Sequence, residues 1–164
     1  DWAHPRRIEA HVDVMEKNPS IVATRSNWIR MTSSGEPVVR TSLGVFTHTN
    51  PASPFYRTRP VRDAIGFYDR VRFDGDLEHW NRLRTHFGVA ATAHVRMPLS
   101  IGLYHANSLT RSGIGKQDES NYSPVRSEYR YRALEWRRRN TDRLRVVEGT
   151  NPFVPPEGML IAID

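Results

Sequence analysis

The sequence predicts an α/β protein in which helices and strands alternate along the chain. Three segments, at 5–17, 76–87 and 123–140, repeat apolar residues at the spacing of a helix. Between them lie segments rich in β-branched and aromatic residues, chiefly 21–31 and 89–105, and this composition is typical of strands. The strands are too few to complete a doubly wound sheet, so we expect part of a larger α/β domain.

The first helix is expected over residues 5–17. Pro5 suits the first helical position, where its missing N–H costs nothing. The helix should end at Pro19, because the residue before a proline avoids the helical conformation. The apolar stripe of this helix consists of Ile8, Val12 and Met15.

A hairpin is expected to follow the first helix. A strand over 21–31 leads into a turn at 33–36, and Val38-Val39 begins a return strand. Residues 47–60 contain three prolines, which predicts a loop around a short extended piece at 55–57.

A short helical segment over 61–65 is expected to end at Gly66, where glycine allows a left-handed helix end. The second main helix is expected over 76–87, with Gly88 ending it. Strands at 89–105 should be broken at Pro98. The apolar face of the second main helix consists of Leu77, Trp80, Leu83 and Phe87.

A loop rich in Gly and Ser covers 106–122, and the third main helix follows it. Ser123 stands at the N-cap, with Pro124 at the first helical position. The tail over 141–164 should be extended and should pack only at Phe153 and 159–161. The helix presents arginines on one face and, on the other, an apolar stripe of Val125, Tyr129, Ala133 and Trp136.

The chain is basic, with 24 Lys and Arg against 18 Asp and Glu, and 22 of the basic residues are arginine. Arginine suits phosphate and carboxylate recognition, so a polyanion partner is one interpretation. The alternative is a solvated basic face, since the arginines are scattered along the sequence.

The absence of cysteine excludes disulfides, thiolate zinc sites and a cysteine nucleophile. No apolar run is long enough for a membrane span and no signal peptide pattern is visible, so we expect a cytoplasmic location.

Residues 73–78 place three carboxylates, Asp74, Asp76 and Glu78, at the start of the second main helix. Carboxylates at a helix start can be simple caps, stabilised by the positive end of the helix. The functional alternative is a general base that takes a proton from an acceptor hydroxyl.

Two further sites are candidates. His105 lies among small polar residues, where a histidine is typically an ordinary surface residue, although it could be a metal ligand with partners from elsewhere. Arg57, near the proline-rich loop, could bind phosphate or an acidic acceptor, or could simply be exposed.

Five segments, taken in order, resemble bacterial glycosyltransferase family 2 of the GT-A type. Residues 1–9, Asp-Trp-Ala-His-Pro-Arg-Arg-Ile-Glu, are similar to the end of the metal-binding segment of the family and the basic helix start after it. Residues 18–23 resemble its turn into a strand, and 50–69 resemble its acceptor-side segment. Residues 75–78 stand where the family carries its acidic catalytic-base motif. Residues 104–110 resemble a late element whose His can complete the metal shell, and together the segments span nearly all of residues 1–137.

The resemblance implies a partial GT-A-like, Rossmann-like domain with a mixed sheet and about three main helices. Residues 1–140 would be the C-terminal part of the catalytic domain, and 141–164 an extended tail. The implied reaction moves a sugar from a nucleotide-sugar to a hydroxyl of a glycan or other acceptor, with inversion. The family also has an N-terminal nucleotide-binding half, so we expect this chain to be a fragment that is inactive alone.

The resemblance also assigns roles to residues. It makes Asp76 the catalytic base. We also expect Arg57 and Glu78 to contact the acceptor or the diphosphate. His105 and Asp1 would be ligands of Mg²⁺ or Mn²⁺.

A non-catalytic basic module that binds nucleic acid or acidic polysaccharide is the competing hypothesis. It rests on the net charge of +6 and on the arginines of the third helix. Against it, aromatic residues are not interleaved with the basic ones, as they are in single-strand binding surfaces. We therefore do not expect a nucleic-acid partner.

Overall fold

The computed structural model describes residues 1–40, 43–118, 120 and 122–161. Their contacts divide the chain into two compact units, of which the first comprises Asp1–Arg57 and Ala90–Ser108, and the second comprises Thr58–Val89 and Leu109–Asp164. The described residues form an open sheet with parallel and antiparallel pairs, together with four α-helices, which confirms the predicted α/β class. None of the described helices is both long and apolar enough to span a lipid bilayer.

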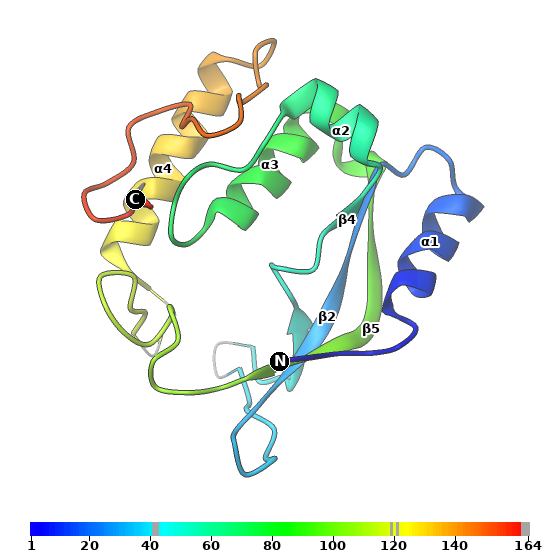
Figure 1. The fold of residues 1–164 in the computed structure, drawn as a ribbon, viewed down its shortest axis with the longest axis vertical. Helices are drawn as coiled ribbons and strands as arrows, with labels where there is room; N and C mark the ends of the chain where they lie inside the picture. Colours follow the sequence, from blue (N-terminus) through cyan, green and yellow to red (C-terminus); the bar gives the residue numbers. More distant parts are fainter. Residues whose placement is uncertain (41–42, 119, 121, 162–164) are drawn as a thin grey trace. The chain divides into compact units, whose positions relative to one another are not determined.

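The first unit is built on a sheet with the strand order β1-β5-β2-β3, and β4 pairs with β2 beyond this path. The two long strands, β2 and β5, run parallel and side by side (Figure 1). The other pairs are antiparallel. The strands are β1 (Trp2–Ala3), β2 (Ala23–Met31), β3 (Thr47–Thr49), β4 (Phe55–Tyr56) and β5 (Thr92–Leu103).

Strand β5 is continuous through Pro98, where the sequence predicts a break. Ser26 of β2 pairs with Val95, but the next residue, Asn27, pairs with Pro98. The register therefore shifts at this point, and a proline can be accommodated because the regular hydrogen-bond ladder is interrupted. A 3₁₀ turn, Val89–Ala91, precedes the strand.

The expected return strand at Val38-Val39 is not a regular strand of the sheet. Directly after the turn, the described residues form only isolated bridges, such as that between Met31 and Pro37. The antiparallel partner of this part of β2 is β3, which lies in the stretch predicted as a loop and pairs Thr49 with Asn27.

Helix α1 (Arg7–Lys17) contacts β2 and β5, and it buries His11 and Met15. The predicted stripe is wrong at Ile8, whose side chain is 66% exposed. His11 takes the buried position instead, because its Nδ1 lies 2.7 Å from the Thr24 hydroxyl and its ring stacks on Phe55. Burial also lowers the pKa of His11 to about 4, so this imidazole is neutral at physiological pH.

The second unit contains α2 (Thr58–Ile65), α3 (Gly75–Phe87) and α4 (Pro124–Arg139). Helix α3 contacts both α2 and α4. The predicted stripe of α4 is confirmed at Tyr129 and Ala133, which are buried. Tyr129 packs in a core whose other members are Val71, Phe73 and Met159, with Val125 and Phe153 against it.

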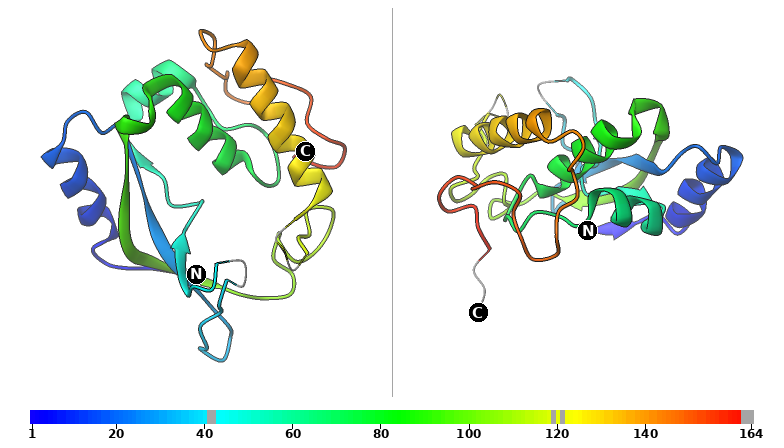
Figure 2. Two further views of the ribbon diagram at one scale, coloured as in Figure 1. Left: turned by 180° about the vertical axis from the view of Figure 1, so that it is seen from behind. Right: turned by 90° about the horizontal axis from the view of Figure 1, so that it is seen from above.

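The segment after α4 turns back and runs beside that helix (Figures 1 and 2). It contains no regular helix or strand in the described residues, and Phe153 and Met159 pack as the sequence predicts. The prediction is wrong at Leu160 and Ile161, whose side chains are exposed. Leu144 and Val146 are buried as well, so more of the segment belongs to the core than we expect from the sequence. The expected division into a catalytic part and a tail at residue 140 stays a prediction.

Gly66 makes the contact that joins this segment to the end of α2. Its φ is +73°, and a Cβ on it would lie 1.9 Å from the Val146 carbonyl oxygen. Val146 donates its N–H to the Ile65 carbonyl at 3.0 Å, and its own carbonyl accepts the Phe67 N–H at 3.1 Å. Only glycine allows both the left-handed backbone and this close approach.

Gly66→Ala should therefore destabilise the protein by about 3 kcal/mol or more, as backbone strain and a steric clash combine. Gly149→Ala is the matched control, because Gly149 also has a positive φ, of +78°, but has nothing within 4 Å of an added Cβ. The control should cost about 1–2 kcal/mol in urea denaturation. Equal losses in the two variants would contradict the packing role of Gly66.

Candidate active site

The acidic segment of the sequence opens helix α3 in the second unit. Asp74 is the N-cap residue, with a left-handed φ of 64°, and its side chain makes no capping hydrogen bond. Asp74 and Glu78 are buried, whereas Asp76 between them is half-buried. Simple capping through the Asp74 side chain therefore does not explain this cluster of carboxylates.

Asp74 is bound by two arginines of α4. Arg126 donates from Nη1 to Oδ1, and Arg130 donates from Nε to Oδ2 at 2.6 Å. The two arginines are four residues apart and so lie on one face of the helix, which allows them to occupy both carboxylate oxygens. Through these two ion pairs, Asp74 holds α4 against the start of α3.

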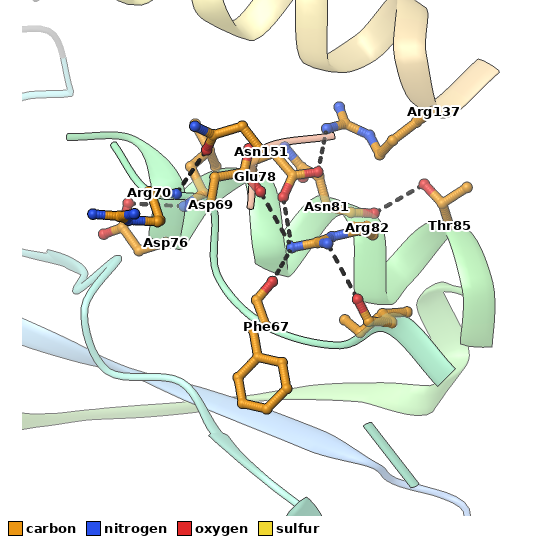
Figure 3. A network of polar contacts seen from close by, with 12 residues as sticks. Phe67, Asp69, Arg70, Asp76, Glu78, Asn81, Arg82, Thr85, Arg137 and Asn151 are labelled. Atoms are coloured by element: carbon orange, nitrogen blue, oxygen red, sulfur yellow. Dashed lines mark hydrogen bonds and ion pairs between the residues drawn. The ribbon is translucent and has the colours of Figure 1, made fainter. Parts of the chain in front are cut away.

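Glu78 is the centre of a second buried network, shown in Figure 3. Its carboxylate lies 3.0 Å from Arg82 and 3.4 Å from Arg137. Arg82 also lies 3.5 Å from Asp69, and Asp69 accepts a hydrogen bond from the Tyr129 hydroxyl at 2.7 Å. Two carboxylates and two guanidinium groups thus neutralise one another in the interior, which is the condition for burying charge without a large penalty.

Arg82 is the most deeply buried member of this network, with 0% exposure. Its guanidinium donates to the Ile65 carbonyl at 3.1 Å and to the Phe67 carbonyl at 2.7 Å. These carbonyls belong to the last residue of α2 and to the second residue after it, so Arg82 ties the end of α2 to α3. The planar fork of arginine suits several acceptors at once.

Burial is the main cause of the pKa shifts in this network. Burial and the nearby Asp69 carboxylate raise the pKa of Glu78 to about 7, although Arg82 and Arg137 oppose the shift. The pKa of Asp69 is also raised by burial, although the Tyr129 hydroxyl and Arg82 oppose the shift. The Glu78 carboxyl group therefore keeps its proton to higher pH than an exposed glutamate does.

Asp76 differs from both of its acidic neighbours. Its Oδ1 accepts the Leu77 N–H at 2.8 Å, and it forms no ion pair within the described part of the chain. Burial raises its pKa, the hydrogen bond from the Leu77 N–H lowers it, the Asp74 charge raises it, and the positive charge of Arg126 lowers it. Asp76 is thus the accessible carboxylate of the three, with a raised affinity for protons.

Asp1 and His105 lie at one end of the sheet in the first unit. The Asp1 carboxylate accepts the Leu103 N–H at 2.7 Å, and Leu103 is the last residue of β5. His105 follows two residues later and is exposed. The structure therefore places both predicted metal ligands near the end of β5.

These two residues do not form a complete metal site by themselves. No group of three or more His, Cys, Asp or Glu side chains able to hold an ion exists among the residues that the structure describes. Divalent metals in proteins take four to six or more ligands. Any metal would need ligands beyond Asp1 and His105.

Arg57 has a structural set of contacts in the first unit. Its Nε donates to the Ile21 carbonyl at 3.1 Å, and its Nη2 donates to the Met15 carbonyl at 2.8 Å. Met15 lies in the last turn of α1, where carbonyls lack helical partners. Arg57 thus holds the end of α1 against the segment that leads into β2. These contacts account for the position of the Arg57 side chain without a ligand.

The arginines of α4 do not form a single solvent-exposed face. Arg126 and Arg137 are buried, whereas Arg132 pairs with Glu128, and Arg138 and Arg139 pair with Glu135. Our prediction did not identify Arg126 and Arg137 as buried, although their spacing in the sequence indicates it. Arg126 and Arg137 extend the buried stripe of α4 at helical spacing on either side of Tyr129 and Ala133.

Glu78→Gln tests the raised pKa in the buried network. Because the folded-state pKa exceeds that of an unfolded glutamate, Glu78 contributes stability at low pH that is lost as pH rises through about 7. The free energy of unfolding of the wild type relative to Glu78→Gln should therefore fall between about pH 5 and about pH 8. Thermal or urea unfolding at several pH values measures this difference.

The control is Glu135→Gln on the outer side of α4, which should keep the pH dependence of the wild type. His79, whose pKa burial lowers to about 4, changes stability in the opposite direction, since its contribution is lost as pH falls. This contribution is common to all three proteins and cancels in the comparison. A wild-type advantage over Glu78→Gln that grows with pH would contradict the assignment.

Comparison of the chain with models of known protein families finds no match, and comparison with curated proteins finds none either.

Proposed function

We propose that this chain is the acceptor-side part of an inverting glycosyltransferase similar to family 2, with Asp76 as the catalytic base. The observation that supports the proposal best is the contrast among the three carboxylates at the start of α3. Asp74 and Glu78 each bind two arginines, whereas Asp76 is half-buried and has no ion pair in the described residues. The order of the five sequence segments that resemble the family supports the same assignment.

A general base must reach the substrate and must bind a proton in the course of the reaction. The Asp74 and Glu78 carboxylates are buried and their oxygens bind arginines, so neither is placed to meet a substrate hydroxyl. Burial raises the pKa of Asp76, which makes it a stronger base than an exposed aspartate. The half-buried position also leaves part of the side chain open to an acceptor.

In the proposed reaction, the acceptor hydroxyl gives its proton to the Asp76 carboxylate as its oxygen forms a bond to the anomeric carbon. The bond from that carbon to the nucleoside diphosphate breaks on the opposite face, so the configuration inverts. The nucleotide-sugar donor would bind to the N-terminal half that the resemblance implies. Mg²⁺ or Mn²⁺, if bound, would act as a Lewis acid on the diphosphate, with ligands beyond Asp1 and His105.

Of the other predicted site residues, His105 is accessible to a ligand, whereas Glu78 and Arg57 make structural contacts. His105 is exposed at the end of β5 and is open to a diphosphate or a metal. Glu78 and Arg57 have their structural contacts described above, so we assign them supporting positions and not contacts to the substrate. A cytoplasmic location fits a nucleotide-sugar enzyme and is part of the proposal.

The alternative of a basic binding module receives less support from the contacts. The arginines of α4 that carry this hypothesis are mostly paired with carboxylates or buried. A paired or buried guanidinium contributes little to a field that attracts polyanions. We therefore prefer the catalytic proposal.

Asp76→Asn should lower kcat by a factor of about 10²–10⁴ in the full-length protein, since the variant keeps the shape but loses the proton acceptor. Turnover is measured as nucleoside diphosphate release from a panel of UDP- and GDP-sugars, with simple glycosides as acceptors. Donor binding and the melting temperature should stay close to wild type, because Asn can still accept the Leu77 N–H. Asp142→Asn, at an exposed position in the same unit, is the control. Turnover by Asp76→Asn at the wild-type rate would refute the catalytic assignment.

A further inference from the structure

Arg126, a buried residue of α4, contacts two other segments of the second unit. Its Nε donates to the Gly115 carbonyl at 2.7 Å, and its Nη2 donates to the Leu109 carbonyl at 3.0 Å. Its Nη1 binds Asp74, and its guanidinium lies over the Phe73 ring at 4.4 Å from the centroid. One buried side chain thus connects α4, the loop that contains residues 109–117 and the turn before α3.

The loop over 109–117 is closed by its own backbone and packs against Phe73, in addition to its hydrogen bonds to Arg126. Gln117 donates its N–H to the Thr110 carbonyl at 2.9 Å, which closes the loop on itself. Gly115 lies directly against Phe73, since a Cβ on it would come within 2.6 Å of the ring. The base of the loop is therefore fixed at Arg126 and Phe73.

The turn before α3 depends on the same side chain. Asp74 has a left-handed backbone, which aspartate adopts more readily than most residues other than glycine. Its carbonyl accepts the Glu78 N–H at 2.9 Å and so begins the first turn of α3, which contains Asp76. Any displacement of the Asp74 carboxylate would therefore move the backbone that presents Asp76.

We propose that Arg126 is a positioning residue that holds Asp76 and the loop over 109–117 in one fixed arrangement for the acceptor. The inference rests on the proposed function, because it gives Asp76 its catalytic role. Arginine is required, since its donors must reach Asp74, Leu109 and Gly115 in different directions within one plane. Lysine has one nitrogen and cannot bind all three acceptors in that geometry.

Arg126→Met and Arg126→Lys test the proposal in the full-length protein, with turnover measured in the same panel of UDP- and GDP-sugars. Both variants should lower kcat by about 10- to 100-fold, as a misplaced catalytic group does, with the KM for the donor little changed. Amide hydrogen exchange without substrate should be faster over 109–117 in both variants. Arg138→Met, an exposed arginine of the same helix, should match wild type in every measurement.

The pH profile separates positioning from general loss of structure. The positive charge of Arg126 lowers the pKa of Asp76, and the negative charge of Asp74 raises it. Arg126→Met should therefore move the acid limb of the pH profile of kcat to higher pH. Arg126→Lys keeps the positive charge, so its acid limb should stay at the wild-type pH while its kcat remains low. If Arg126→Met does not fold, Gly115→Ala disturbs the same loop contact and should also lower kcat.

Wild-type kcat in Arg126→Lys, or unchanged exchange over 109–117 in Arg126→Met, would overturn the inference. These results would leave the proposed function standing as long as Asp76→Asn remains inactive. Wild-type turnover in Asp76→Asn would instead overturn the proposed function itself. The two failures are therefore distinguishable.

Discussion

The need to neutralise buried arginines governs the second unit. Arg82, Arg126 and Arg137 are buried, and an isolated charge in the interior would be very costly. Each is therefore matched to a carboxylate, and the matching joins α4 to α3 and α3 to the end of α2. Because Asp74 and Glu78 serve this purpose, their positions follow from the packing of the helices, and Asp76 is left to another role.

This arrangement connects stability with the proposed chemistry. Removing one partner of a buried ion pair is typically far more costly than losing an exposed pair, by about 3–5 kcal/mol against about 1 kcal/mol or less. The paired carboxylates therefore hold the start of α3 rigidly, and a rigid first turn keeps a base in a defined place. Asp76 benefits from this rigidity without giving its own carboxylate to an ion pair.

The sequence predicts what depends on local patterns and misses what depends on contacts between distant residues. The helices around 7–17, 75–87 and 124–139 follow from apolar spacing, Pro124 and the terminal glycines. The pairing of β3 with β2 could not be predicted, since residues 47–49 have no strand pattern of their own. Arg57 and Arg126 looked alike in the sequence, as solvated cations, and only the fold shows that each binds backbone carbonyls. The sequence predicts the acidic segment, but not the ion pairs that bury Asp74 and leave Asp76 without one in the described residues, because the partners of Asp74 are more than fifty positions away.

The most direct test of the account is the titration of the Asp76 carboxyl group by ¹³C NMR in the chain without substrate. The titration should give a pKa above the ordinary value of an aspartate, since burial and the Asp74 charge both disfavour the ionised form. Asp74→Asn should lower the pKa of Asp76, because a neighbouring negative charge is removed. A pKa of Asp76 at or below the ordinary value of an aspartate would contradict the claim that the arginines of α4 leave this carboxylate unpaired and available as a base.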